Sequence, residues 1–320
     1  MDRREVLRMA AGLALTGTAS AIAETQRRVP IIDSHIHLFD TSRLGGVPWP
    51  PKTDEVLYRR AIPSRYQRIT HEFGVVGAIA VEASPIESDN DWILKQAAKN
   101  PVIVGVVGNL VPGTPPFARE LERLHANPLF VGIRYGNLWN RDLFADAKKP
   151  GFIHDIRLLA AAGLELDSAN PDARLIEAIL AVSQQVPELR IVIDHLPNAV
   201  IPAEPTARGQ YWTTVKSLSQ NAGVFMKLSE VPVREGSRLQ TAPSFYRDRL
   251  DALWDLFGED RILFGSDWPN SDHVADYAET LGIVRTYVSE KGAVALEKYF
   301  WKNSITAYRW RRRLPDQPAV

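Results

Sequence analysis

The segment VPIIDSHIHLFD, residues 29–40, places two histidines one residue apart at the end of an apolar run, in a chain with only 7 histidines. Side chains alternate between the two faces of a β-strand, so His35 and His37 project from one face and Ile36 from the other. Two neighbouring imidazoles can bind one metal ion. Asp33 has the same parity one layer deeper, where its carboxylate could orient an imidazole.

A carboxylate ends a second apolar run near the C-terminus, in FGSDWPN over residues 264–270. Asp267 shares its parity with Leu263 and Gly265, so it projects from the same face at the end of that strand, and Gly265 leaves space beneath it. A carboxylate at this point is a candidate metal ligand and general base. The alternative is an aspartate that only forms the turn before Trp-Pro.

The segment IVIDHLP, residues 191–197, ends a third apolar run with an acid and a histidine. His195 has the parity of Ile193 and should point inward, with Asp194 turned the other way unless the strand has already ended. An inward histidine could bind a metal or, as a general acid, polarise a substrate carbonyl. The alternative is a loop histidine packed on Pro197.

Three further runs end in polar residues, and one more histidine lies close to the last run. Glu82 is a candidate additional metal ligand. Arg134 suits a substrate carboxylate or lactone oxygen, because guanidinium forms forked hydrogen bonds to such groups. Lys227 and Glu230 end another run, and Lys227 suits an ion pair as well as a substrate contact. His273 is a candidate substrate contact.

Eight short runs rich in Val, Ile, Leu and Gly predict strands, and amphipathic segments between them predict helices. Strands that alternate with helices form parallel βαβ units, so eight of them predict an α/β fold, a closed (β/α)8 TIM barrel over residues 29–310. An open doubly wound sheet is disfavoured because no glycine-rich phosphate loop follows the first strand. The predicted strands begin at Pro30, Val75, Val102, Leu129, Gly163, Leu189, Gly223 and Arg261, and the predicted helices span 91–100, 115–127, 172–186 and 245–258.

The active site of such a barrel lies at the carboxyl ends of its strands. Closure makes the first and eighth strands neighbours, which places Asp267 beside His35 and His37. The long segment 41–64, which contains VPWPPK, is either a loop that covers the substrate or surface decoration. Residues 311–320 are expected to form a polar, solvated tail.

Composition excludes several classes of function. The 38 basic and 38 acidic side chains cancel, so no net field attracts nucleic acid or anionic lipid, and no nucleic-acid partner is expected. The absence of cysteine excludes thiol catalysis, thiolate metal sites and disulfide bonds.

The first 23 residues resemble an export signal of the twin-arginine type. Arg3 and Arg4 precede a short run of Ala, Leu and Gly, and residues 21–23 form an A-x-A cleavage site. The alternatives are a frayed amphipathic helix or a lipoprotein-like anchor. We expect export, with a periplasmic location and no membrane span in the mature protein, because the apolar run is too short. Since this route carries folded proteins, a metal could be acquired in the cytoplasm.

Four motifs, IIDSHIHLFD, IVIDHLP, VFMKLSE and RILFGSDWP, together resemble the amidohydrolase superfamily, and within it the amidohydrolase-related (amidohydrolase 2) lactonases that act on sugar lactones and on pyrone or muconolactone rings. The resemblance spans nearly all of residues 29–310. It implies a TIM barrel that uses a divalent metal, usually zinc, to hydrolyse esters, lactones or amides. Some ring-opening members work without a tightly held metal.

The resemblance also implies roles for single residues. His35 and His37 match the metal positions of the first strand, Asp267 matches the ligand and general base of the last strand, and His195 matches the ligand or acid of the sixth. Metal-binding relatives often have a histidine in the fifth strand, where this chain has only Glu165 and Asp167 within GLELDSA.

This departure argues against a dinuclear site and against the decarboxylase branch of the superfamily. One zinc ion is expected, with manganese as the alternative. Glu82, His195 and water remain candidates for the fourth ligand, and a metal-independent reaction remains open.

The sequence therefore predicts a hydrolase that opens a cyclic ester by attack of water. The small-molecule substrate would be a sugar-acid lactone, a muconolactone or pyrone-type lactone, or another ring that bears a carboxylate. Asp267 would accept a proton from the attacking water, and His195 or Arg134 would stabilise the developing oxyanion. The two alternatives are a non-oxidative decarboxylase on the same scaffold and an exported binding protein that has lost catalysis.

Overall fold

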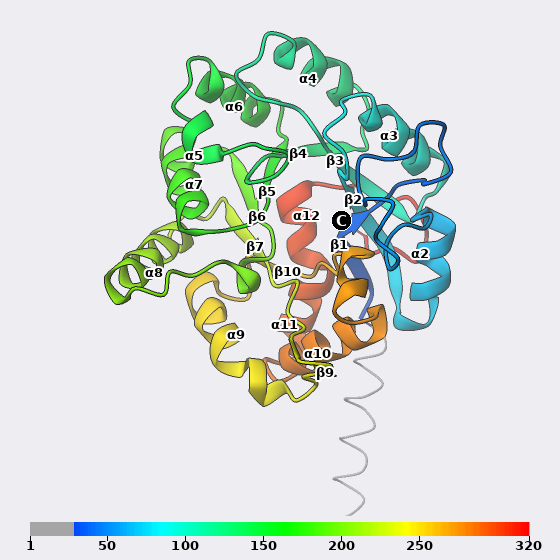
Figure 1. Ribbon diagram of the computed structural model, residues 1–320, viewed down its shortest axis with the longest axis vertical. Coiled ribbons are helices and arrows are strands. Elements are labelled where there is room, and N and C mark those ends of the chain that lie inside the picture. The colour runs from blue at the N-terminus through cyan, green and yellow to red at the C-terminus, as the bar shows by residue number, and fades with distance from the viewer. Residues whose placement is uncertain (1–28, 320) are drawn as a thin grey trace, which may run out of the picture.

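The computed structural model describes residues 29–319, so the predicted signal peptide at residues 1–23 lies outside the described part of the chain. Eight parallel strands form one sheet in the order of the sequence (Figure 1). The predicted (β/α)8 barrel is confirmed, with every strand where the sequence analysis placed it. The strands are β1 (Ile31–His37), β2 (Val75–Val81), β3 (Ile103–Gly108), β4 (Phe130–Arg134), β5 (Glu165–Ser168), β6 (Arg190–Ile193), β7 (Val224–Lys227) and β10 (Ile262–Leu263), and a separate hairpin is formed by β8 (Arg234–Glu235) and β9 (Arg238–Leu239).

Backbone hydrogen bonds join the last strand to the first. The Asp267 N–H donates to the His35 carbonyl at 2.9 Å, and the His37 N–H donates to the Trp268 carbonyl at 2.7 Å. These bonds extend the contact beyond the two residues of β10. Asp267 is therefore held against the strand that contains both histidines, as closure of the barrel predicted.

The helices surround the barrel and cover its outer face (Figure 1). Side-chain caps begin several of them: Asp172 caps α7 through the N–H of Leu175, and Asp276 forms a capping box with Glu279 in α10. In the described part of the chain, no helix combines the length and apolar character that crossing a membrane requires. The helices are α2 (Pro63–Thr70), η1 (His71–Phe73), α3 (Asp89–Lys99), α4 (Phe117–His125), α5 (Leu143–Asp146), α6 (Phe152–Ala161), α7 (Ala173–Gln185), η2 (Leu196–Asn198), α8 (Pro205–Ser219), α9 (Pro243–Phe257), η3 (Asn270–His273), α10 (Tyr277–Ser289), α11 (Ala293–Glu297), η4 (Lys298–Lys302) and α12 (Asn303–Tyr308).

The barrel interior below the site is packed mainly with β-branched side chains, which suit a pleated, fully buried surface. Tyr308 and Trp310, near the C-terminus, belong to the same cluster. This packed floor leaves the carboxyl ends of the strands as the place for polar chemistry. The strand residues of the cluster are Ile32, Ile79, Val81, Val104, Val107, Val131, Val192, Phe225 and Leu263.

Asp33 departs from the parity predicted for β1. The pairing of β1 with β2 shifts register between Asp33 and Ile36. The Asp33 carboxylate accepts hydrogen bonds from the hydroxyls of Tyr66 and Tyr277, at 2.9 and 3.1 Å, and from the Ser266 N–H at 2.8 Å. Burial raises its pKa. The prediction that Asp33 orients an imidazole is wrong, because the irregular pairing turns its carboxylate towards α2 and α10, where it ties these helices to the barrel.

The C-terminal tail, described as far as residue 319, has exposed residues, but two of its side chains dock against the barrel. Gln317 is only 2% exposed, and its Nε2 donates to the carbonyls of Val76 and Pro101 at 2.9 and 3.0 Å. Arg313 Nη1 donates to the carbonyls of Ala97 and Ile103, both at 2.7 Å. These acceptors lie near the beginnings of β2 and β3, so the tail covers the face of the barrel opposite to the strand ends.

Candidate active site

β1 brings both histidines of the His-x-His pair to the carboxyl end of the barrel. Their Nε2 atoms lie 3.2 Å apart, and both side chains are buried. The Val81 carbonyl lies 3.1 Å from Nδ1 of His37, and because a carbonyl only accepts, that nitrogen holds the hydrogen and Nε2 keeps its lone pair. Burial lowers the pKa of His37 to about 4 and also lowers the pKa of His35, which keeps both rings neutral, as metal ligation requires.

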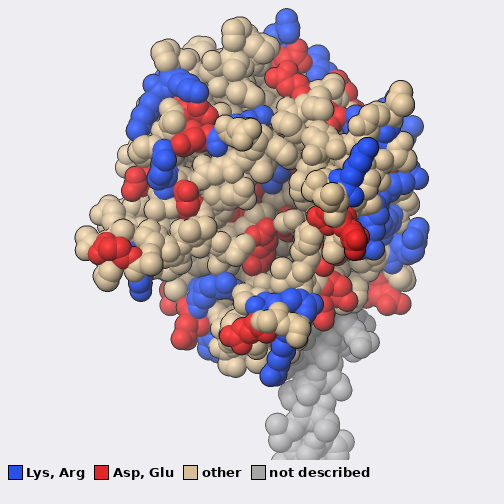
Figure 2. Space-filling view, in the orientation of Figure 1, with Lys and Arg blue, Asp and Glu red and all other residues tan. Residues whose placement is uncertain are grey.

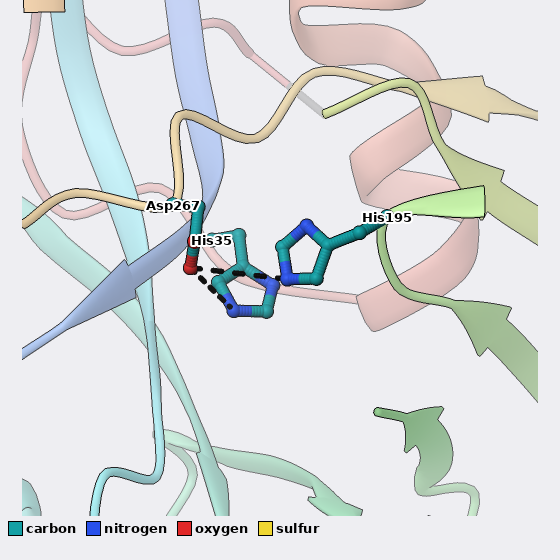
Figure 3. A group of neighbouring side chains, drawn as sticks. All are labelled: His35, His195 and Asp267. Atoms are coloured by element: carbon teal, nitrogen blue, oxygen red, sulfur yellow. Dashed lines mark ion pairs between the residues drawn. The ribbon is translucent and has the colours of Figure 1, made fainter. Parts of the chain in front are cut away.

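Asp267 faces three imidazoles, of which Figure 3 shows those of His35 and His195. Its Oδ1 lies 3.2 Å from Nε2 of His37, 3.5 Å from Nε2 of His35 and 3.8 Å from Nε2 of His195. Within residues 29–319 this buried Oδ1 accepts no hydrogen bond, whereas Oδ2 accepts one from Asn270 at 2.7 Å. Burial raises the pKa of Asp267. An unpartnered carboxylate oxygen among imidazole nitrogens is a donor set that a bound cation would complete.

Several residues at this end of the barrel have left-handed backbone conformations, which are unfavourable for residues with a Cβ and gather at functional sites. Among those with polar, chemically active side chains are His195, Glu230 and Asp267, with φ angles of 52°, 49° and 59°, and Trp139 and Asn170 share this conformation with φ angles of 58° and 56°. All five line one cavity. Strand parity could not predict the direction of His195, because β6 ends at Ile193 and the turn sets the direction instead.

His195 has two polar neighbours besides Asp267. Its Nδ1 lies 2.8 Å from the Ser229 hydroxyl, and its Nε2 lies 4.0 Å from Oε1 of Glu230. Glu230 also accepts a hydrogen bond from Asn198 at 2.5 Å. Burial would raise the pKa of Glu230, but His195 and these hydrogen bonds outweigh it, so its pKa is lowered and it remains an anion.

The residues present are compatible with a divalent cation. One ligand atom from each of His35, His195 and Asp267 lies within 4.8 Å of the others, and Nε2 of His37 lies 3.2 Å from Asp267 Oδ1. His37 and His195 both have their Nδ1 atoms engaged by protein groups, which leaves Nε2 towards the centre. Such outer contacts are usual for metal-binding histidines.

Lys227 lies beneath the histidines and is fully buried. Its Nζ lies 2.6 Å from Asp167, 2.8 Å from Asp194 and 3.0 Å from Nδ1 of His35. Burial would lower the pKa of Lys227, but the two carboxylates outweigh it and raise its pKa. Likewise burial would raise the pKa of Asp194, but Lys227 and then His35 hold it below its usual range. The sequence analysis considered an ion pair and a substrate contact for Lys227, and in the structure Lys227 forms the ion pair.

Glu82 is the partner of Arg134. Its Oε1 accepts a hydrogen bond from Arg134 Nε at 2.9 Å, and its Oε2 accepts one from the Ser84 N–H at 2.9 Å. The indole N–H of Trp139 lies 3.1 Å from both oxygens. Both oxygens of Glu82 are therefore occupied, which argues against the tentative assignment of Glu82 as a metal ligand.

The site opens into a cavity of about 220 Å³. Figure 2 shows acidic atoms in the hollow at the middle of this face. Trp49 lies in the long segment 41–64 and packs edge-on against His37, with ring centroids 5.6 Å apart, so this segment helps to enclose the site. His273 does not line this cavity; it lines an adjoining hollow that shares Asp267 with it, and its Nε2 lies 2.9 Å from Asp54. The lining residues are His37, Trp49, Ala83, Arg134, Leu138, Trp139, Asn170, His195, Glu230, Asp267 and Asn270.

Gly265 provides the space that His35 occupies. A Cβ added at Gly265 would lie 2.8 Å from Cβ of His35, so Gly265→Ala must displace the histidine. We expect a loss of about 1–3 kcal/mol in the free energy of unfolding, measured by urea denaturation. Gly282→Ala in α10 is the matched control, since an added Cβ there meets nothing within 4 Å and should stabilise the helix. Equal stability of the two variants would contradict this packing.

Several polar residues of the site were not predicted as such. Asp194 was expected to turn away unless the strand had already ended. β6 ends at Ile193, and Asp194 contacts Lys227 and lies 3.5 Å from His35. Ser229 and Asn270 orient His195 and Asp267. The polar pair Ser229-Glu230, which follows the VFMK run after Leu228, and Asn270 after Trp-Pro were the available indications.

A parallel eight-stranded barrel with imidazoles and carboxylates gathered at the carboxyl ends of its strands defines an enzyme of the barrel hydrolase class. The family model described as Amidohydrolase matches residues 32–310, and the chain belongs to that family.

Three relatives, one found by sequence and two by structure, are similar to this chain over most of its length. The L-fucono-1,5-lactonase of Burkholderia ambifaria is 29% identical over 301 residues, covering 90% of this chain and 98% of that protein. An amidohydrolase of Burkholderia multivorans, crystallised with bound zinc, superposes with a TM-score of 0.76 at 23% identity, covering 88% of this chain and all of that one. A putative 2-pyrone-4,6-dicarboxylic acid hydrolase of Pseudomonas putida superposes with a TM-score of 0.66 at 19% identity, covering 88% of this chain and 98% of that one.

Proposed function

We propose that the protein hydrolyses the ring ester of a neutral, polyhydroxylated lactone of a sugar acid. The observation that supports this most strongly is Asp267, whose unpartnered Oδ1 faces three imidazoles at the base of the cavity. The similarity to an L-fucono-1,5-lactonase over 90% of the chain supports the same reaction.

The chain supplies the groups that ester hydrolysis requires. Asp267 Oδ1 accepts the proton of the attacking water and returns it to the alkoxide that leaves when the ring opens. His195 lies 3.8 Å from Asp267 Oδ1 and borders the same cavity, where its Nε2 is placed to hold a metal ion beside the substrate carbonyl. Arg134 also borders the cavity and adds a fixed positive charge.

A divalent ion, which we propose to be zinc, would be held by His37, His195 and Asp267, with His35 beside them. When bound, such an ion lowers the pKa of a water molecule towards about 7 and polarises a carbonyl.

The charges around the cavity favour a neutral substrate. Arg134 already donates to Glu82 through Nε at 2.9 Å and through Nη2, to the Glu82 carbonyl, at 2.7 Å. Glu230 and Asp267 place two further carboxyl groups on the wall. A carboxylate on the substrate would meet these acids without a free guanidinium fork to bind it, and like charges brought together are costly.

The uncharged walls of the cavity suit a sugar ring. Trp49 and Trp139 present indole surfaces, and Asn170 and Asn270 present side-chain amides. Aromatic surfaces can cover the apolar face of such a ring, and amides can bind its hydroxyls.

A panel of lactones tests this proposal. Each neutral aldonolactone is paired with an acid of the same ring size that bears one additional carboxylate, and 2-pyrone-4,6-dicarboxylate and a muconolactone are included. We expect kcat/KM to be at least about 10-fold higher for the neutral member of each pair, which corresponds to about 1.4 kcal/mol. Proton release, corrected for spontaneous hydrolysis, measures the rates. Preference for the acids would refute the neutral substrate, and release of CO2 without ring opening would favour the decarboxylase alternative.

We further propose that residues 1–23 direct export by the twin-arginine route and that the mature enzyme works in the periplasm. The support is the Arg3-Arg4 pair and the A-x-A site at residues 21–23. The double substitution of Arg3 and Arg4 by lysine should leave the uncleaved precursor in the cytoplasm, as immunoblots of cell fractions would show. Export that is unchanged by the double substitution would count against this route.

A further inference from the structure

The ammonium of Lys227 has three polar neighbours in the protein. Its Nζ is hydrogen-bonded to Asp167 at 2.6 Å and to Nδ1 of His35 at 3.0 Å, and it forms an ion pair with Asp194 at 2.8 Å. The same three neighbours form a second group with the spacing of metal ligands. In this chain a lysine side chain occupies the position between them, so a cation is already built into the second group.

The contact with Lys227 determines which nitrogen of His35 holds the hydrogen. Two carboxylates within 2.8 Å keep the amine in its charged form, and an ammonium cannot accept a hydrogen bond. Nδ1 of His35 must therefore be the acceptor, and in the neutral ring the hydrogen is on Nε2. That Nε2–H points to the region of His37 Nε2 and Asp267 Oδ1, at 3.2 and 3.5 Å.

His35 and His37 thus differ although they share one face of β1. Nδ1 of His37 meets the Val81 carbonyl, so its Nε2 has a lone pair to give to a metal. His35 has the opposite arrangement, since its hydrogen is on Nε2 and its lone pair is on Nδ1. A metal ion can bind only the nitrogen that lacks a hydrogen.

We propose that Lys227 takes the place of a second metal ion and withdraws His35 from the ligand set, so that a divalent ion is held by His37, His195 and Asp267 alone. The Nε2–H of His35 donates to His37 Nε2 at 3.2 Å, and Asp267 Oδ1 lies 3.5 Å away without accepting it. Lys227 is in this sense a positioning residue, which acts through His35. The inference concerns metal binding and does not depend on the identity of the ester.

Zinc binding to three proteins, each first freed of metal by a chelator, tests this inference. They are the unaltered protein, Asp167→Asn, and the double variant Lys227→Met with Asp167→Asn. The double variant removes one positive and one negative charge together and leaves Asp194, 3.5 Å away, as the charged acceptor for Nδ1–H of His35. A carboxylate that orients a histidine in this way changes metal affinity by about 10–100-fold.

We expect the double variant to bind zinc about 10–100-fold more tightly than the unaltered protein in competition with a zinc indicator. Asp167→Asn retains Lys227 against His35 and should stay within about 3-fold of the unaltered protein, well short of that gain. Equal affinity of a folded double variant and the unaltered protein would overturn the inference, and so would a similar gain in Asp167→Asn.

A second measurement uses the unaltered, metal-free protein and does not depend on the folding of any variant. Nitrogen-15 NMR of labelled histidines distinguishes the two neutral forms of each ring, and His35→Asn identifies the signals of His35 by their loss. We expect His35 with its hydrogen on Nε2 and His37 with its hydrogen on Nδ1. A hydrogen on Nδ1 of His35 would refute the inference, whereas loss of lactone hydrolysis alone would bear only on the proposed function.

Discussion

Replacing Asp267 by asparagine is expected to lower kcat/KM for lactone hydrolysis by about 10²–10⁴-fold, the range for loss of a general base. The amide has the size of the carboxylate, and its oxygen can still accept the hydrogen bond that Asn270 donates to Oδ2 at 2.7 Å. It cannot take a proton from water at neutral pH. Initial rates of proton release, corrected for uncatalysed hydrolysis, measure the loss, and circular dichroism shows that the fold is retained.

Asp272→Asn is the matched control for this prediction. Asp272 lies in η3, five residues further along the chain, and its carboxylate lies 3.2 Å from Arg59 and 3.4 Å from Arg65, outside the cavity. The same change of charge there should leave the rate near that of the unaltered enzyme. Hydrolysis at the unaltered rate by Asp267→Asn would show that Asp267 is not the base.

Replacing Lys227 alone by methionine is expected to destabilise the protein by about 3–5 kcal/mol, the cost of breaking a buried ion pair. Lys227, Asp167 and Asp194 are each fully buried, and methionine would leave both carboxylates without their positive partner. Tyr308 would remain a hydrogen-bond donor to Asp167 at 2.8 Å, but a hydroxyl does not neutralise a charge. The midpoint of urea denaturation measures the effect.

Two comparisons separate this effect from the loss of lysine packing. Adding Asp167→Asn should restore part of the stability, because only one buried carboxylate then remains to be compensated. Lys291→Met should have a far smaller effect, since Lys291 is partly exposed and its Nζ contacts a single carboxylate, that of Asp251, at 2.6 Å. A Lys227→Met variant no less stable than Lys291→Met would contradict the prediction.

Regular strand geometry explains how much of the site could be predicted from the sequence. His35 and His37 were placed together because side chains in a strand alternate with a period of two. Asp267 was placed beside them because the barrel closes between its first and last strands, and the backbone bonds of His35 and His37 to residues 267 and 268 are those of that closure. These inferences required only a regular repeat and a strand order.

The inferences that failed depended on irregular geometry or on distant partners. The register shift after Asp33 and the end of β6 at Ile193 cannot be read from alternation, so Asp33 was assigned to the wrong side and the side of Asp194 was left to depend on where the strand ends. Glu82 was considered a metal ligand because the sequence does not show its ion-pair partner, Arg134, which lies 52 residues further along the chain. For the same reason the pairing of Lys227 with His35, across 192 residues, was not foreseen.

The docked C-terminal tail has a consequence for the order in which the chain becomes complete during translation. Arg313 and Gln317 bind carbonyls that lie 216 and 241 residues earlier, at Ala97 and Val76. A nascent chain therefore has all the residues of its cavity outside the ribosome before it can cover the opposite face of the barrel. A truncation that removes Arg313 and the residues after it would therefore leave all the residues of the site present and take away these contacts at the base of the barrel.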